Sequence, residues 1–216
     1  MANYKKSAET RRSIVQALEY LVRKNGYTKI SIKDISDYLG IPRSLIYYYF
    51  KNKDDIMHVL YHEQFNKTEE LAKTVLPRGE EPLVRLMLKY LLYRQMIVCD
   101  PLFNEYVATA PEYAARGETA TKKQIMLYYS DSRDAFAYYG KSTDGNEFYL
   151  HILMVESIAR GLIVGTFRGL LNLTDSEFLT LFGERAIMPT FGLTKEQFKA
   201  ILNRAFELEE QIKNIK

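Results

Sequence analysis

Two histidines lie one helical turn apart at positions 58 and 62, and Glu63 follows the second of them. Such a pair can chelate a metal ion, but the metalloprotease pattern needs a glutamate directly after the first histidine, where this chain has Val59. His151 is the only other histidine and the chain has one cysteine, so a closed zinc site is not expected. The sequence carries no phosphate-binding glycine loop and no serine in a nucleophile elbow. We therefore predict no catalytic residues, no metal and no cofactor, and a protein that is not an enzyme.

A second group of chemically active side chains is the excess of lysine and arginine near the N-terminus. Residues 1–60 hold 11 Lys or Arg against 6 Asp or Glu, a net charge of +5, whereas the remaining residues hold 19 against 21, a net charge of −2. A basic segment joined to a near-neutral one indicates an anionic partner. A chance excess of solvated basic side chains is the alternative that charge alone leaves open.

The single cysteine, Cys99, cannot form an internal disulfide, so we expect a reducing compartment and a cytoplasmic protein. The N-terminal segment MANYKKSAETRR has no apolar core, so no secretory signal is expected. The most apolar stretch, 148–171, contains Glu156, Arg160 and Arg168. It therefore reads as a buried helix, and no membrane partner is predicted.

The sequence predicts that the basic N-terminal segment is helical. Ile14, Leu18 and Leu21 form one apolar face over 8–25, and Gly26 then ends the helix. Ser31 begins a second helix, over 32–39, with Asp34 three positions on, as in a capping box. Pro42 opens a third helix over 43–49, and Asn52 caps a fourth that runs to about residue 75.

The pattern stays helical beyond "PRGEEP" (77–82), the clearest break in the chain. Helices are predicted over 83–99, 102–110, 118–139, 147–171, 175–183 and 195–213, with breaks that include "MPTFG" (188–192). No strand alternation appears. The prediction is an all-α protein with a small head, residues 1–53, and a larger helical body, residues 54–216.

Helices 32–39 and 43–49, joined by Gly40-Ile41-Pro42, have the lengths and the glycine turn of a helix-turn-helix. The stretch "GIPRSLIYYYFKNKDDI" closely resembles the recognition helix and following linker of the TetR family of transcriptional regulators, and "ALEYLVRKNGYTKISIKDISDYLG" resembles the family's first two helices. The resemblance covers about residues 10–60. It implies an N-terminal three-helix DNA-binding head on a larger helical domain that binds an effector and dimerises.

The resemblance also implies which residues meet DNA. Tyr47 and Tyr49 are expected to face the duplex, while Tyr48 and Phe50 turn back toward the head. Lys53 matches a lysine that grips the DNA backbone. The remaining predicted DNA-binding residues are Arg43, which starts the recognition helix and can read guanine, Ser44 and Leu45 beside it, and Ser31 and Lys33 at family positions that often contact DNA.

The body is expected to hold the dimer interface and the effector. Gly161, Gly165 and Gly169 recur every four residues and would let another helix approach closely, in a second subunit or within the chain. The residues proposed to contact an unidentified small molecule are Tyr90, Tyr93, Met96, Tyr106, Tyr113, Met126, Tyr129, Glu156 and Arg160, although Glu156 and Arg160 could instead form a structural pair.

The predicted function is a sequence-specific DNA-binding transcriptional regulator, acting as a homodimer on a double-stranded operator, and a repressor that a small-molecule effector releases. The alternative is a helical protein- or ligand-binding module that keeps the helix-turn-helix only as a scaffold.

Overall fold

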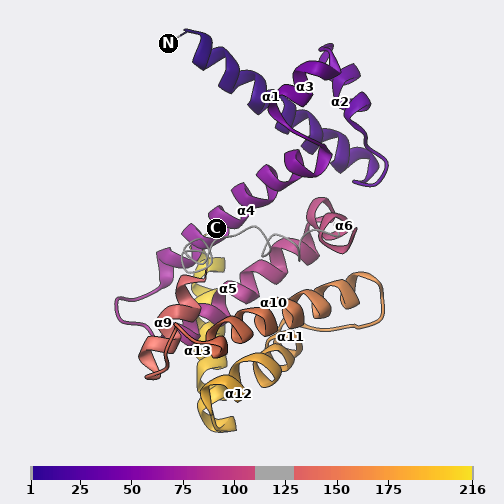
Figure 1. Cartoon of the computed structure of the whole chain (residues 1–216). Coiled ribbons are helices and arrows are strands. Elements are labelled where there is room, and N and C mark those ends of the chain that lie inside the picture. Colours follow the sequence, from indigo (N-terminus) through magenta and orange to yellow (C-terminus); the bar gives the residue numbers. More distant parts are fainter. Residues whose placement is uncertain (1, 110–128, 216) are drawn as a thin grey trace. The chain divides into compact units, whose positions relative to one another are not determined.

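The computed structural model describes residues 2–109 and 129–215. All regular secondary structure in these ranges is helical, as the sequence predicts (Figure 1). The contacts divide the chain into two compact units. Of the described residues, 2–66 and 97–109 form unit 1, and 67–96 and 129–215 form unit 2. Unit 1 therefore includes a segment, 97–109, that lies far beyond the head in the sequence.

Unit 1 contains α1 (Ala2–Asn25), α2 (Ile32–Leu39), α3 (Arg43–Tyr49), the first part of α4 (Lys53–Val75) and α6 (Pro101–Thr109). Its interior is apolar and draws on every one of these helices. The buried side chains include Ile14, Leu18, Ile35, Ile46, Ile56, Tyr61, Phe103 and Tyr106. Since α2 and α3 are too short to be stable alone, this packing holds the helix-turn-helix in shape.

The turns of unit 1 have the caps that the sequence predicts. Ser31 and Asp34 form a capping box at the start of α2, and Gly40, with φ +63°, ends that helix in the left-handed conformation. The Asn52 side chain accepts a hydrogen bond of 2.8 Å from the Asp55 amide, which is an N-cap contact at the start of α4. These caps fix where α3 begins and ends.

Gly26 ends α1 with φ +88°, and a carboxylate from α6 closes the same turn. Glu105 accepts hydrogen bonds from the Tyr27 amide (2.6 Å) and the Thr28 amide (3.2 Å). Arg23 donates to both carboxylate oxygens of Asp100, at 3.0 and 3.1 Å. These contacts fasten α6 to the end of α1 and the loop that leads into α2.

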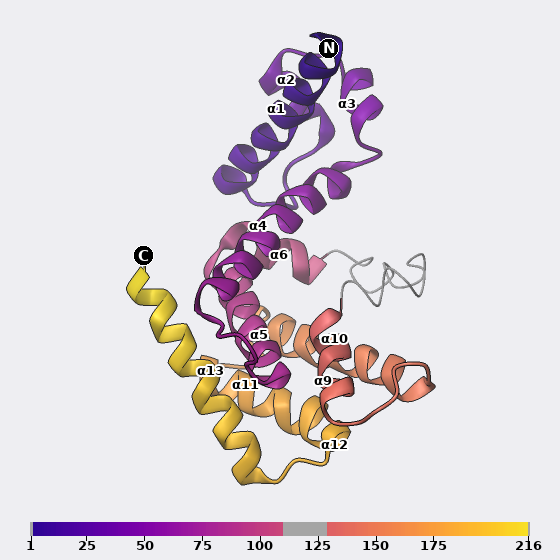
Figure 2. The same cartoon turned by 90° about the vertical axis from the view of Figure 1, so that its left-hand side faces the viewer.

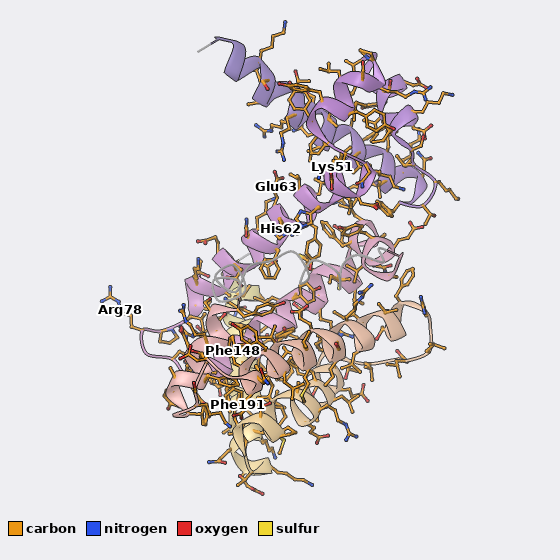
Figure 3. The ribbon with its side chains drawn as sticks, viewed as in Figure 1. Lys51, His62, Glu63, Arg78, Phe148 and Phe191 are labelled. Carbon is orange, nitrogen blue, oxygen red and sulfur yellow. The ribbon has the colours of Figure 1, made fainter. Side chains whose placement is uncertain are left out.

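Unit 2 contains most of α5 (Pro82–Cys99), followed by α9 (Ser130–Tyr138), α10 (Asn146–Phe167), α11 (Asp175–Phe182), the π-helical η2 (Gly183–Ile187), α12 (Met188–Phe191) and α13 (Lys195–Ile215). α10 packs on α9, α11 and η2 (Figure 2). Phe148 from α10 and Phe191 from α12 lie in the interior that these helices enclose (Figure 3).

Two sequence-based boundaries are wrong. The helix expected over 147–171 ends at Phe167, because Gly169 takes φ +69° and the Leu170 and Leu171 amides bond back to the Gly165 carbonyl. The break expected at "MPTFG" is helical, since Pro189 stands in the first turn of α12, where a missing N–H costs little. The predicted helix 118–139 is described only from residue 129.

α10 has the length and composition of a membrane-spanning helix, and it is the one such helix among the described residues. A core helix of a soluble protein passes the same test. One side of α10, including Phe148, Val155 and Ile163, is buried in unit 2, whereas Leu150 and Leu153 on the other side are exposed. The helix therefore has a face that the described helices of unit 2 leave uncovered.

Candidate nucleic-acid interface and effector site

One side of α3 carries exposed polar and aromatic side chains. Successive helical residues point about 100° apart, and the buried Ile46 and Phe50 fix one side of the helix against the core of unit 1. Arg43 and Ser44 are exposed at the start of α3, and Tyr47 is 54% exposed one turn later. An arginine, a hydroxyl and a phenol thus share a solvent-facing surface on the second helix of a helix-turn-helix.

The tyrosine triplet is oriented differently from the sequence-based expectation. Tyr48 is 78% exposed and does not turn back toward the head. Tyr49 is half-buried, and its hydroxyl donates a hydrogen bond of 3.1 Å to the Ser7 hydroxyl of α1. Tyr48 lies one turn after the exposed Ser44. Residues at i and i+4 share a helix face, so this spacing in the sequence could have predicted that Tyr48 is exposed. We name Arg43, Ser44, Tyr47 and Tyr48 the α3 face.

Lys53 begins α4, but its ammonium group is engaged inside unit 1. Its Nζ donates a hydrogen bond of 2.7 Å to the Tyr27 carbonyl and lies 3.9 Å from the centre of the Tyr27 ring. Burial lowers the pKa of Lys53, an effect that the charges of Asp54 and Glu105 oppose. An ammonium group has three N–H donors, so this contact leaves capacity for a phosphate oxygen as well.

The other predicted DNA-binding residues lie in or near α2 and α3. Ser31 is exposed, with its hydroxyl occupied by the capping box, where it donates to Asp34 at 2.6 Å. Lys33 is exposed and forms a loose ion pair of 3.9 Å with Asp37. Leu45 is half-buried. The Ser31 hydroxyl therefore caps α2, whereas the charged end of Lys33 is exposed to water.

In unit 2, four of the predicted effector residues come together. Tyr90 donates a hydrogen bond of 3.4 Å to the Glu156 carboxylate, and the Tyr129 side chain also hydrogen-bonds to that carboxylate. Burial raises the pKa of Glu156, while Tyr129, Tyr90 and the charge of Arg160 act in the opposite direction. The Tyr90 ring lies 4.4 Å from that of Phe182, centre to centre. A carboxylate, a guanidinium and two phenols thus meet beside apolar rings. We name Tyr90, Tyr129, Glu156 and Arg160 the Glu156 cluster.

The remaining predicted effector residues have other surroundings. Tyr93 is half-buried, with its ring centre 6.3 Å from that of Tyr90. Met96 is buried, and its sulfur is 3.8 Å from the Thr68 hydroxyl. Tyr106 belongs to unit 1, where it is fully buried against Tyr27 and Tyr61, so it is a core residue there and not part of the Glu156 cluster. Tyr113 and Met126 lie outside the described residues.

The three glycines of the predicted dimer ridge do not form one continuous surface. Gly165 is buried, and a Cβ there would lie 2.8 Å from the Leu171 side chain of the same chain. Gly169 lies beyond the end of α10 in the left-handed conformation. Gly161 is exposed, with open space where a Cβ would stand. Only Gly161 therefore faces the uncovered side of α10.

The short helix pair, its exposed α3 face and the helical unit 2 define a class of protein: a helix-turn-helix head of the DNA-binding type on an all-α body. Residues 14–60 match the model of the family described as "Bacterial regulatory proteins, tetR family". The head of the chain is therefore similar to the N-terminal part of the TetR family of transcriptional regulators.

Curated relatives have a similar sequence over part of their length. The chain is 28% identical over 109 residues to the HTH-type dhaKLM operon transcriptional activator DhaS of Lactococcus lactis, which covers 48% of this chain and 57% of the relative. It is 29% identical over 102 residues to the HTH-type transcriptional regulator TtgR of Pseudomonas putida, covering 47% and 45%. The chain spans about half the length of the curated relatives it matches.

Solved structures share the fold over nearly the whole chain. RolR, in a complex with resorcinol, has a TM-score of 0.66 at 14% identity and covers 94% of this chain and 95% of its own. The fatty acid degradation regulator FadR of Bacillus halodurans has a TM-score of 0.53 at 13% identity, with coverages of 86% and 96%. These likenesses show that the chain has a known all-α fold.

Proposed function

We propose that the protein is a sequence-specific DNA-binding transcriptional regulator, acting in the cytoplasm as a repressor that a small-molecule effector releases. The observation that carries the proposal is the α3 face, which is exposed on the second helix of a TetR-type head. The alternative, a helical module that does not bind DNA, is less favoured because the matching relatives are named as transcriptional regulators.

The chemistry of the α3 face suits a DNA major groove, which is wide enough to accept a helix. Arg43 would donate two hydrogen bonds to guanine O6 and N7, a contact that discriminates against other bases by about 1–3 kcal/mol. The Tyr47 and Tyr48 hydroxyls would bond phosphate oxygens and fix the docking position. Ser31, Lys33, Leu45, Tyr49 and Lys53 would support or flank this contact. We propose that residues 1–53 are the DNA-binding domain and residues 54–216 the effector-binding and dimerisation domain.

A homodimer is the form in which this regulator would bind. A helix-turn-helix reads a few base pairs, and a twofold dimer doubles the site on a near-palindromic operator. The uncovered side of α10 offers a surface for the second copy, because it exposes Leu150 and Leu153, the latter by 64%, together with the open backbone of Gly161. An exposed apolar stripe of this kind is typical of an association surface.

The Glu156 cluster is the proposed effector contact. Its carboxylate and phenol groups would exchange their present partners for hydroxyl or amine groups of a ligand, and the neighbouring rings would stack on its apolar part. Resorcinol is a suitable first probe, since RolR has the same fold and was solved with it. Effector binding would change operator affinity by a coupling free energy of about 1–3 kcal/mol.

The experiment is the selection of bound duplexes from the protein's own genome, followed by affinity measurements on the selected sequence. Arg43→Ala is expected to relax the preference at one base pair of each half-site and to weaken operator binding by about 5- to 150-fold per half-site. Arg185→Ala removes the same charge from an exposed site in unit 2 and is expected to bind like the parent. Unchanged base preference in Arg43→Ala would contradict the assigned docking face.

A further inference from the structure

The proposed function makes no use of the histidine pair on α4. His58 and His62 lie one turn apart in the part of α4 that belongs to unit 1, and both rings are half-buried. Figure 3 shows His62 on this helix. Their Nε2 atoms are 2.8 Å apart and their ring centres 4.0 Å apart. The two nitrogens are therefore closer together than the two rings, so the rings converge on their Nε2 edges.

This separation is close to the distance between two imidazole nitrogens that bind the same metal ion. An ion bound to two imidazole nitrogens at about 2.0–2.1 Å, with an angle of about 90–110° between the bonds, holds those nitrogens about 2.8–3.4 Å apart. The observed 2.8 Å lies at the lower end of that range, which corresponds to an angle near 90°. A small rotation of either ring reaches the larger separations without a change in the backbone.

The surroundings hold the pair in place and keep it available. Tyr61, which is almost fully buried, packs its ring edge-to-face with His62 at 5.9 Å and also contacts Phe103 and Tyr106. The ring nitrogens of both residues are the ligand atoms that imidazole offers to a metal ion. The turn of α4 that carries the pair is thus anchored in the core of unit 1.

Although the sequence pattern led us to expect no metal, we propose from this geometry that His58 and His62 form an open, two-nitrogen binding site for a divalent transition-metal ion. Among the described residues, no group of three or more His, Cys, Asp or Glu side chains could enclose an ion, so water would complete the coordination. Imidazole nitrogen suits Cu²⁺, Ni²⁺ and Zn²⁺, whereas Mg²⁺ and Ca²⁺ prefer oxygen ligands. Copper is expected to bind most tightly, according to the general order of divalent affinities.

The competing explanation is a plain hydrogen bond, in which one Nε2–H donates to the other Nε2. It accounts for the same 2.8 Å distance and predicts no metal affinity beyond that of a lone histidine. The two explanations differ in what a second imidazole contributes. A chelating second ligand is intramolecular and raises the affinity for the ion by about a hundredfold or more.

The test is calorimetric titration of the metal-free full chain with CuCl₂, NiCl₂, ZnCl₂ and MgCl₂. We expect one transition-metal ion per chain, strongest for copper, and no measurable heat with magnesium. His58→Gln and His62→Gln should each weaken copper binding by about a hundredfold. Cys99→Ser is the control, since Cys99 is the exposed cysteine, and it should bind like the parent.

A spectrum of the parent protein makes the outcome independent of how well the variants fold. Electron paramagnetic resonance of the one-to-one copper complex should show hyperfine splitting from two nitrogen ligands. The proposal is overturned if the spectrum shows one nitrogen or none, or if both histidine variants bind copper as tightly as the parent.

Discussion

The three consecutive tyrosines at 47–49 have different surroundings, although they belong to the same short helix. Ile46 and Phe50 are buried, and they set the rotation of α3. That rotation leaves Tyr47 and Tyr48 in water and brings the Tyr49 hydroxyl onto Ser7. Two phenols are thus available to a phosphate backbone, while the third ties α3 to α1.

Lys53 is expected to act on both stability and DNA binding. Lys53→Ala removes the bond to the Tyr27 carbonyl and the contact with the Tyr27 ring, and we expect a loss of about 1 kcal/mol in the free energy of unfolding. If the remaining N–H groups hold a phosphate, affinity for all duplexes should fall alike and the salt slope should flatten by about one.

Thermal unfolding and salt-dependent anisotropy measure these two effects of Lys53→Ala separately. Lys51→Ala is the control for stability, because the Lys51 side chain is exposed, and its melting temperature should match the parent's. A Lys53→Ala protein as stable as the parent would mean that the Tyr27 contacts contribute nothing. An unchanged salt slope would remove Lys53 from the DNA contacts.

His151 is expected to make stability depend on pH. Its ring is buried between Phe136 and Phe191, and burial lowers its pKa to about 4 from an ordinary value of 6.5. Between these values the unfolded chain binds the proton and the folded chain does not, so stability falls as the pH is lowered from about 6.5 toward 4. The slope from this one group is at most about 1.4 kcal/mol per pH unit.

The contribution of His151 can be isolated by comparing melting temperatures of the parent and His151→Phe from pH 7.5 to 4.5. Phenylalanine fills the aromatic site without a titrating group, so the variant should lose less stability in that window. Carboxylates titrate in both proteins and cancel in the difference. Parallel pH profiles would show that His151 is protonated equally well in the folded chain.

At the scale of elements, α6 is the least expected part of unit 1. It lies about 80 residues after α1 in the sequence, yet Asp100 and Glu105 bind Arg23 and the Tyr27–Thr28 amides. Burial alone would raise the pKa of Glu105, but the hydrogen bonds from Thr28 and Tyr27 lower it overall. The carboxylate is therefore charged at neutral pH and closes the turn before α2.

Glu105→Gln tests this closure. An amide keeps only one oxygen to accept bonds from two backbone N–H groups, so we expect a loss of about 1–3 kcal/mol in the free energy of unfolding. Hydrogen exchange at the Tyr27 and Thr28 amides should also become faster. Glu63→Gln changes an exposed glutamate on α4 and should leave both measurements unchanged. Equal exchange rates in Glu105→Gln and the parent would contradict the closure.

Local signals in the sequence predicted most of the helices, because caps and apolar spacing act over a few residues. The capping box at Ser31, the turn at Gly40 and the bounds of α2 and α3 all follow from such signals. The contacts of Glu105 could not be predicted in this way, because they join segments that are far apart in the sequence and share no local pattern. Tyr106 looked like a pocket residue for the same reason: its burial depends on Tyr27 and Tyr61 in distant segments.

At the scale of the molecule, the proposed function needs two copies of the chain. In the proposed dimer each copy would supply one α3 face, and the uncovered side of α10 would supply the apolar surface for association. The sequence indicated this helix through its glycines, but it could not distinguish Gly161, which faces open space, from Gly165, which Leu171 covers. That distinction depends on the chain reversal after Phe167.

Gly161→Arg is expected to separate the dimer without disturbing the fold of one chain. The position is exposed, and a Cβ there meets no atom within 4 Å, so the start of the new side chain fits without a clash, but it places a charge in the apolar stripe. Sedimentation should give a mass near the 25.2 kDa of one chain, against about twice that for the parent. Gly145→Arg, at the open N-terminal end of α10, is the matched control. A dimeric Gly161→Arg protein would move the interface elsewhere.

The most direct measurement of the central claim is the affinity of the purified protein for its selected duplex and for a scrambled duplex, over a range of salt concentrations. Counterion release predicts that the logarithm of the binding constant falls linearly with the logarithm of salt concentration. The account predicts this fall together with a preference of about a thousandfold or more for the selected sequence. Equal affinity for both duplexes, or no duplex binding at low salt, would contradict it.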